Sequence, residues 1–224
     1  MQNTYKLSNI DSDDISDVLL KVEKSFDFRF GNTELKEVKT FGELCDIIVN
    51  KTQGNNLNDC TTQQAFYKVR NAIADVSFSD RNKIMPDTYL QQLFPKHERR
   101  QKISAVENLL GFKTKILRPK HWITWTLVIS LIASFIGLFI FWKLFIVILV
   151  ISTVGLKLSE KFGNEFDLQT IGQLSEKITR EHYKKVRRNI GTVNRNEVVL
   201  KVKELFKHDL GLEESSLTRE ATFN

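Results

Sequence analysis

The sequence predicts an all-α protein, and three observations lead to this class. Apolar residues recur three and four positions apart in several segments, which is the spacing of one face of a helix. Helix start and stop signals punctuate those segments, among them Pro86, Pro95 and Gly211. One stretch, residues 122–156, is apolar and contains a single charge, Lys143. With 224 residues, the chain is long enough for one or two domains with a core.

The N-terminal segment, residues 10–50, is predicted to hold three helical stretches. The first covers residues 14–25 and begins after an Asp-Ser-Asp sequence whose side-chain oxygens can cap a helix. A short second stretch covers residues 33–38, and a third begins after Thr40. The apolar faces of the first and third helices are formed by Ile15, Val18, Leu19, Val22, Phe41, Leu44, Ile47 and Ile48.

A polar linker at residues 51–60 leads to a small basic helical module, residues 61–112. Within this module the sequence predicts helices at 61–75 and 97–110. A short helix between them starts after Pro86 and Asp87, carries Leu90, Leu93 and Phe94, and is stopped by Pro95.

Residues 121–158 are predicted to form a transmembrane helical hairpin. The apolar block of about 35 residues exceeds the roughly 20 that one helix needs to cross a bilayer, so two spans fit. The turn between them is expected near Phe141, Trp142 and Lys143. The alternative is one long tilted helix that buries Lys143 at a cost of about a few kcal/mol.

Positive charge flanks the apolar block on both sides. By the positive-inside tendency, both flanks and both termini are expected on the cytoplasmic side of the inner (plasma) membrane, as two spans require. Basic residues close to a membrane surface attract anionic lipids. The residues expected to contact lipid head groups are Lys113, Lys115, Arg118, Lys120, Lys184, Lys185, Arg187 and Arg188.

A basic juxtamembrane helical segment, residues 159–190, comes next and contains a partial internal repeat. QTIGQL at 169–174 repeats the T-Φ-G-x-L pattern of KTFGEL at 39–44, and FGNEF at 162–166 parallels FDFRF at 26–30.

The last segment, residues 194–224, is predicted to form an amphipathic helix that ends with Gly211 as its C-cap. A polar loop with two apolar anchors, Leu217 and Phe223, comes after that helix.

No sequence motif of catalysis or metal binding was found. The two cysteines, Cys45 and Cys60, have no spacing typical of a disulfide framework or a zinc site, and both are expected to be reduced, Cys45 in a helix core. The four histidines are scattered and are expected at the surface. No nucleophile elbow, Walker loop, dinucleotide fingerprint or zincin motif occurs, so an enzyme is not expected. The first thirty residues lack the pattern of a cleavable signal peptide.

Two segments resemble parts of one known domain, the acyl carrier protein. Residues 197–223, EVVLKVKELFKHDLGLEESSLTREATF, resemble its first helix and long loop. Residues 11–49 resemble the remainder of such a domain: an Asp-Ser step, a helix with an F-x-F-x-F close, a short helix and a last helix with TFGELCDII. The resemblance implies one four-helix bundle, assembled in circularly permuted order from both ends of the chain. The alternative is a homodimer in which two chains complete each other by segment exchange.

The resemblance also implies that Ser12, which comes directly after Asp11, is the attachment site of 4′-phosphopantetheine, whose thiol carries acyl chains. A helix N-terminus suits a phosphate. The sequence departs from the family in two ways, because Asp13 stands where the family has Leu and no Gly precedes Asp11. In the alternative interpretation these residues only cap a helix. The same resemblance implies that partners dock on the helix face formed by Asp14, Asp17 and Glu23. The alternative is that this is an ordinary solvated helix face.

The expected function is therefore that of a membrane-anchored acyl-carrier-like protein, which serves acyl-chain carriage or docks lipid-handling enzymes at the cytoplasmic face. Membrane lipids and acyl-transferring enzymes are the expected partners. The alternative is a membrane-tethered nucleic-acid-binding or structural adaptor protein without a prosthetic group, based on Lys68, Arg70, Arg99, Arg100 and Lys102. Because juxtamembrane lipid contact explains this charge more simply, no nucleic acid is expected as a partner.

Overall fold

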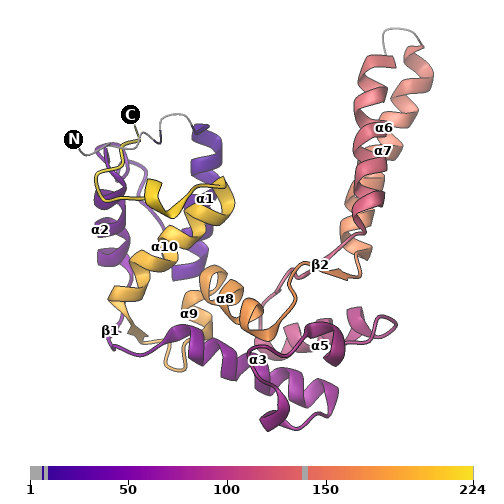
Figure 1. Ribbon diagram of the computed structural model, residues 1–224. Helices are drawn as coiled ribbons and strands as arrows, with labels where there is room; N and C mark the ends of the chain where they lie inside the picture. Colours follow the sequence, from indigo (N-terminus) through magenta and orange to yellow (C-terminus); the bar gives the residue numbers. More distant parts are fainter. Residues whose placement is uncertain (1–6, 8–9, 138–140, 224) are drawn as a thin grey trace. The chain divides into compact units, whose positions relative to one another are not determined.

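The computed structural model describes residue 7, residues 10–137 and residues 141–223 of the chain (Figure 1). Most of these residues lie in α-helices, and each described strand is only two residues long, so the predicted all-α class is confirmed. The chain forms two compact units. Unit 1 consists of Met1–Lys68 and Ser175–Asn224, and unit 2 consists of Val69–Leu174.

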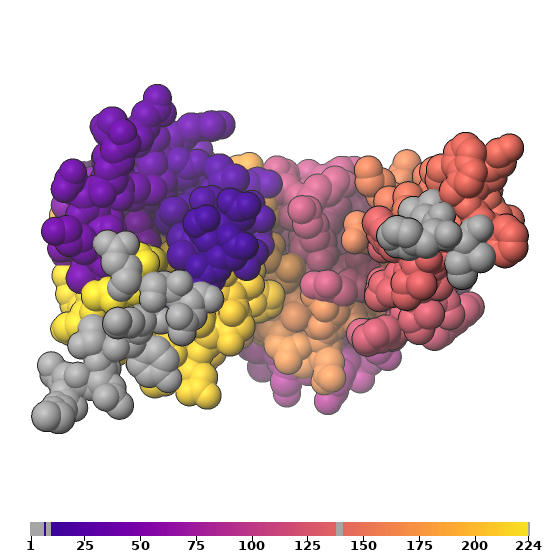
Figure 2. Space-filling view, turned by 90° about the horizontal axis from the view of Figure 1, so that it is seen from above, coloured from indigo at the N-terminus to yellow at the C-terminus, as the bar shows by residue number. Residues whose placement is uncertain are grey.

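Three helices build most of unit 1: α1 (Ser12–Phe26), α2 (Phe41–Lys51) and α10 (Arg195–Leu210). They bury apolar side chains from both ends of the chain in one core, and Figure 2 shows the N-terminal residues in indigo against the C-terminal residues in yellow. Burying one such large apolar side chain stabilises a fold by about 1.5–3 kcal/mol. The core residues include Val18, Val22, Phe26, Phe41, Leu44, Cys45, Ile48, Val198, Val202, Leu205, Phe206, Leu217 and Ala221.

The ends of these helices are explained by their sequences. Asp11 caps α1, Thr40 and Glu43 form a capping box at α2, and Gly211 ends α10 with a left-handed φ of 65°. The prediction of a helix at 33–38 was wrong. Those residues form successive turns, in which the backbone N–H groups of Glu34, Lys36 and Val38 each bond to the carbonyl three residues before, and no helix is propagated.

Two loops of unit 1 are joined by a short parallel ladder and a buried polar network. Strand β1 (Asn55–Asn56) pairs with β4 (Thr192–Val193). Beside this ladder, the short helix α9 (Tyr183–Val186) leads to Arg187, whose side chain is fully buried and bonds to Asp59, Thr61 and Thr192. A turn of 3-10 helix, η3 (Glu214–Ser216), comes after α10.

Unit 2 contains the rest of the helices. Helix α3 (Thr61–Ser77) begins in unit 1 and continues into unit 2, and α8 (Ile171–Glu181) begins in unit 2 and continues into unit 1. The other elements of unit 2 are η2 (Arg81–Lys83), α4 (Leu90–Leu93), α5 (Arg99–Leu110), α6 (His121–Gly137), α7 (Trp142–Phe162), and the antiparallel strands β2 (Leu117–Arg118) and β3 (Glu165–Phe166).

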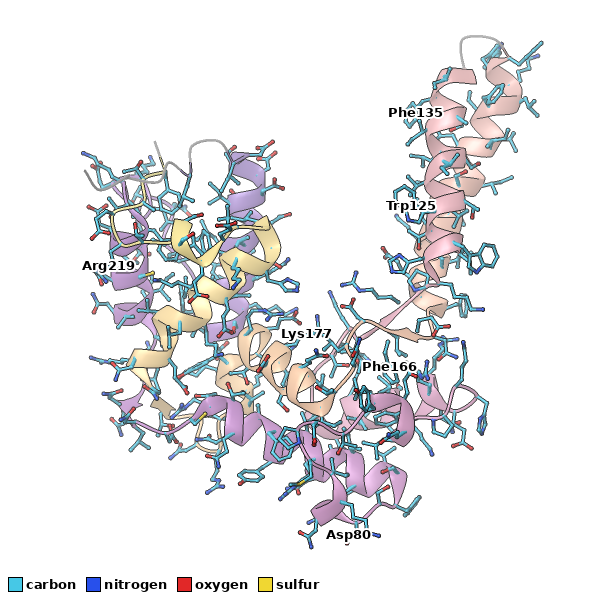
Figure 3. All side chains as sticks on the ribbon, in the orientation of Figure 1. Asp80, Trp125, Phe135, Phe166, Lys177 and Arg219 are labelled. Carbon is cyan, nitrogen blue, oxygen red and sulfur yellow. The ribbon has the colours of Figure 1, made fainter. Side chains whose placement is uncertain are left out.

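Helices α6 and α7 are antiparallel and packed side by side (Figure 1). A hydrogen bond of 3.0 Å joins the hydroxyls of Ser152 and Ser130, and Gly155 lies against Leu127. Many of their large apolar side chains are exposed. Among these are Trp125 and Phe135, labelled in Figure 3, which are 63% and 55% exposed.

Among the helices of the described residues, α7, at 21 residues, is the one both long and apolar enough to cross a membrane; the described part of α6 is apolar and has 17 residues. The turn predicted near residues 141–143 adjoins residues 138–140, which lie outside the described residues. Helix α7 itself begins at Trp142, after Phe141.

Candidate functional site

The N-terminal end of α1 carries the residue predicted as the attachment site. Ser12 is the first residue of this 15-residue helix, and its side chain is exposed. Asp11 caps the helix, because its Oδ1 accepts a hydrogen bond of 3.0 Å from the backbone N–H of Asp13. Asp11 therefore caps α1, and Ser12 lies exposed directly after this cap.

Around Ser12 the surface is acidic. Asp11, Asp13, Asp14 and Asp17 are all exposed, and no cation lies within ion-pair distance of their carboxylates in the part of the chain that the structure describes. Negative charge at a helix N-terminus is favoured by the helix dipole, so the fold tolerates this cluster without a partner cation. The resulting electrostatic field suits a positively charged macromolecular surface.

Glu23, which was predicted on the same face, is half-buried and has a structural role. Its Oε1 accepts a hydrogen bond of 2.6 Å from the backbone N–H of Phe30, so the carboxylate holds the chain just after α1. Asp27, which ends the helix, has a left-handed φ of 57°. Glu23 therefore fixes the exit of the helix, and its part in a docking face stays a prediction.

An open cleft of about 530 Å³ lies at this C-terminal end of α1. Its lining mixes both charges with apolar side chains, and includes Leu20, which is 59% exposed. The residues around it are Leu20, Glu23, Lys24, Asp27, Phe28, Arg29 and Lys185. The volume is that of a small-molecule site, but the open, charged lining is unlike the mostly apolar walls of such sites.

A second open cleft of unit 1, of about 610 Å³, was not predicted from the sequence. It is lined by Thr62, Glu176, Arg180, Lys201, Glu204, Lys207, His208, Gly211 and Leu212. Lys201 is paired with Glu204 at 2.7 Å and Lys207 with Glu214 at 3.3 Å, so much of its positive charge is already compensated. Since these residues come from three helices and the loop after α10, no local sequence pattern could have indicated them.

The cations predicted to contact lipid head groups fall into two groups. Lys115, Lys120, Lys185 and Arg188 are exposed, as are Lys113 and Arg118, which pair with Glu107 and Asp167. Lys184 and Arg187 are buried. Lys184 donates to the carbonyls of Gln53 and Ile190, and burial, with the neighbouring charge of Arg187, lowers the pKa of Lys184. These two residues are structural and cannot reach a head group in this fold.

Basic residues of α5, the basis of the nucleic-acid alternative, also make contacts within the chain. Arg99 is buried, donates to the carbonyls of Phe94 and Asn164, and stacks over the ring of Phe166. Arg100 donates to the carbonyl of Lys161 and lies over the ring of Phe162.

Cys45 and the histidines were also the subject of predictions. Cys45 is buried, as predicted, and burial raises its pKa to about 12, so its thiol is unreactive at neutral pH. His182, which was predicted at the surface, is only 6% exposed. Within the described ranges, no group of three or more His, Cys, Asp or Glu could hold a metal ion. Comparison with protein-family models, curated proteins and solved structures found no match for the chain.

Proposed function

We propose that this chain is a membrane-anchored, acyl-carrier-like protein whose carrier bundle is formed by residues 10–50 and 194–224, within unit 1. The observation that carries the proposal is the exposed Ser12 hydroxyl at the start of α1, on a bundle whose core is completed by the last helix of the chain. The order of helices implied by the resemblance is α10, its long loop, α1 and α2. The common core of α10, α1 and α2 supports that order.

The membrane anchor is formed by α6 and α7, as two spans. Support comes from the length of α7 and from the many large apolar side chains that both helices expose. Such a surface needs lipid or another apolar partner around it. Both termini and both soluble parts then lie on the cytoplasmic side of the inner membrane, where the exposed cations near the helix ends contact anionic head groups.

Carriage of an acyl chain uses Ser12 as the attachment point. The chemistry of the site fits a phosphopantetheine arm, because the hydroxyl is exposed and the helix N-terminus favours a phosphate. When bound, the arm supplies a thiol that holds the acyl group as a thioester. The acidic side chains of Asp13, Asp14 and Asp17 provide the surface on which partner enzymes with basic patches dock.

Intact mass is the test of carriage. The full chain is co-expressed with a broad-specificity phosphopantetheinyl transferase, as wild type, as Ser12→Ala and as Ser215→Ala, which replaces another exposed serine of unit 1. We expect the mass of one arm in the wild type and in Ser215→Ala, and none in Ser12→Ala. An unmodified wild type would overturn carriage and leave enzyme docking as the function of the bundle.

A further inference from the structure

In unit 1, the loop after α10 crosses the start of α2 as a strap, which we define as residues 214–223. Thr222 of the strap forms a β-bridge with Thr40. Three backbone hydrogen bonds join the strap to the start of α2: Phe41 N to Ala221 O at 2.8 Å, Gly42 N to Arg219 O at 2.9 Å, and Phe223 N to Lys39 O at 3.0 Å.

Unit 2 contains the same arrangement in a second strap, residues 81–90, which crosses the start of α8. Tyr89 forms the matching β-bridge with Thr170. The matching hydrogen bonds are Ile171 N to Thr88 O at 3.1 Å, Gly172 N to Pro86 O at 2.7 Å, and Leu90 N to Gln169 O at 2.8 Å. The bridge and the three hydrogen bonds therefore occur at the same sequence spacing in the two straps, both along the strap and along the start of the helix.

The helices that the straps cross also begin alike. At α2, the Glu43 carboxylate accepts from the N–H groups of Lys39 and Thr40 at 2.7 and 3.1 Å. At α8, the side-chain oxygen of Gln173 accepts from Gln169 and Thr170 at 2.7 and 3.3 Å. In both boxes the threonine hydroxyl accepts in return from the N–H of the residue three positions on.

Similar helices precede the straps. Counted back from the strap, Val198, Val202 and Phe206 of α10 match Ala65, Val69 and Ile73 of α3, and all six are fully buried. Each helix is followed by a left-handed residue, Gly211 with φ 65° or Phe78 with φ 52°. A turn of 3-10 helix then comes next in both cases, η3 or η2, followed by a buried apolar residue, Leu217 or Ile84.

Helices α1 and α5 correspond as well. Both end at a left-handed residue, Asp27 and Gly111. In α5, Glu107 accepts a hydrogen bond of 2.8 Å from the backbone N–H of Thr114, seven residues on, as Glu23 does from Phe30 in α1. This pair of glutamates fixes the register between the two helices.

The register places Lys96, which lies in the turn three residues before α5 begins at Arg99, where the first arrangement has Ser12. Residues 11–17 contain four aspartates and no cation, whereas residues 95–101 contain Lys96, Arg99 and Arg100 with a single carboxylate, Glu98. The charge of this helix end is therefore reversed. Residues 95–101 also contact the end of α7 and the residues just after it. Arg100 donates to the carbonyl of Lys161 in α7 at 3.3 Å. Beyond the helix, Lys96 Nζ bonds to Glu165 at 2.7 Å, Asn164 Nδ2 to Lys96 O at 2.8 Å, and Arg99 to Asn164 O at 2.6 Å. Cations suit the carbonyl end of a helix.

We propose that residues 61–112 and 167–182 are a second copy of the fold formed by residues 194–223 and 10–52, and that α6 and α7 are an insertion into this second copy. The insertion stands between α5 and α8, where the first copy has only the turns of residues 31–38. The helix end that carries Ser12 in the first copy is the seat of α7 in the second. The first copy presents an open end to partners, and the second copy anchors the membrane helices.

The straps are tested by a matched pair of glycine substitutions in the full chain in detergent micelles. A Cβ on Gly42 would lie 2.7 Å from the carbonyl oxygen of Arg219, and a Cβ on Gly172 would lie 3.0 Å from that of Pro86. We expect Gly42→Ala to speed amide hydrogen exchange in residues 214–223, and Gly172→Ala to speed it in residues 81–90, each by about 5- to 30-fold. Gly31→Ala, which meets only ordinary contacts, is the control.

The seat is tested by the double variant Lys96→Gln, Arg100→Gln. In this double variant we expect hydrogen exchange in residues 161–166 to be faster than in the wild type. Lys102→Gln is the control, because the side chain of Lys102 pairs with Glu98. Residues 81–90 staying protected in Gly172→Ala would overturn the second copy, and unchanged exchange at 161–166 would overturn the seat. Neither readout depends on modification of Ser12, so an unmodified Ser12 would leave this inference standing.

Discussion

The two copies use the same backbone devices and opposite surfaces. In both, a strap crosses the start of a capped helix at a glycine, Gly42 or Gly172. In both, a glutamate near the end of a helix, in α1 or α5, accepts a hydrogen bond from the backbone seven residues on. Around Ser12 the surface is acidic and lacks ion pairs to described residues, whereas around Lys96 it is basic and engaged by the chain after α7. The fold thus depends on a few backbone positions, and exposed helix ends are free to change their use.

The left-handed positions make the same point at the level of single residues. Gly211 and Gly111 are the residue type that this conformation favours, but their counterparts are Phe78 and Asp27. A non-glycine residue there costs about 1–2 kcal/mol. Phe78 is also 96% exposed, so its ring contributes almost nothing to the core. The conformation is maintained by the surrounding helix and strap rather than by the residue itself.

The largest effect is expected from matched core truncations. Phe206, fully buried and edge-on to Phe41 with ring centroids 5.2 Å apart, corresponds to the fully buried Ile73. We expect Phe206→Ala to lower the free energy of opening of unit 1 by about 3–5 kcal/mol, and Ile73→Ala to lower that of α3 by about 2–5 kcal/mol. Amide hydrogen exchange, resolved by peptide, measures both values.

Leu200 provides the control for this pair, because it lies on α10 and is 54% exposed. Its replacement by alanine is expected to change the free energy of opening by no more than about 0.5 kcal/mol. An effect of Phe206→Ala as small as that of Leu200→Ala would mean that α10 does not complete the core of the N-terminal helices.

Sequence periodicity predicted much of the first copy. Most residues of the predicted apolar faces of α1, α2 and α10 lie in the core, although Ile15 and Ile47 are only half-buried, and Gly211 ends α10 as predicted. The T-Φ-G-x-L repeat was the one sign of the second copy in the sequence. It occurs where the backbone contacts between strap and helix require particular residues. By the glutamate register of the proposed second copy, residues 26–30 match 110–114, whereas the sequence comparison had paired them with 162–166.

The rest depends on contacts between distant segments. Nothing local distinguishes Arg187, which is buried against Asp59 and Thr61, from the exposed Arg188 next to it, so both were predicted at a lipid surface. Likewise Glu23 was assigned by its place on a helix face, whereas its use is set by the chain bending back at Phe30. Of the candidate site, the exposure of Ser12 and the cap at Asp11 could be predicted, because both are consequences of a helix start.

A smaller effect is expected at the two capping threonines. Thr40→Ala and Thr170→Ala each remove a hydroxyl that accepts from the first turn of α2 or α8. Each change should destabilise its own helix start by about 1 kcal/mol. Hydrogen exchange at residues 41–44 and 171–174 measures the two losses, and clearly unequal losses would show that the two boxes are not equivalent in solution.

The smallest expected effect is a difference between the two copies in how the stability of a helix start depends on pH. Glu43 has a titratable carboxyl, whereas its counterpart Gln173 does not. Hydrogen bonds from the backbone N–H groups of Lys39 and Thr40 hold the pKa of Glu43 below its ordinary value of 4.5. A carboxyl with a lowered pKa in the folded state stabilises the fold above its unfolded pKa, and that contribution is lost as the pH falls through the lowered value.

Below pH 4.5, protection of the start of α2 should therefore decline, after correction for intrinsic exchange rates, while the start of α8 keeps its protection. An ion pair between Arg219 of the strap and Asp46 of α2 also joins these two segments, so the wild type alone does not isolate Glu43. Glu43→Gln does, because it gives α2 the same uncharged box as α8. If the acid response of α2 were the same in Glu43→Gln as in the wild type, Glu43 would not be its source, and the two capping boxes would be equivalent at every pH.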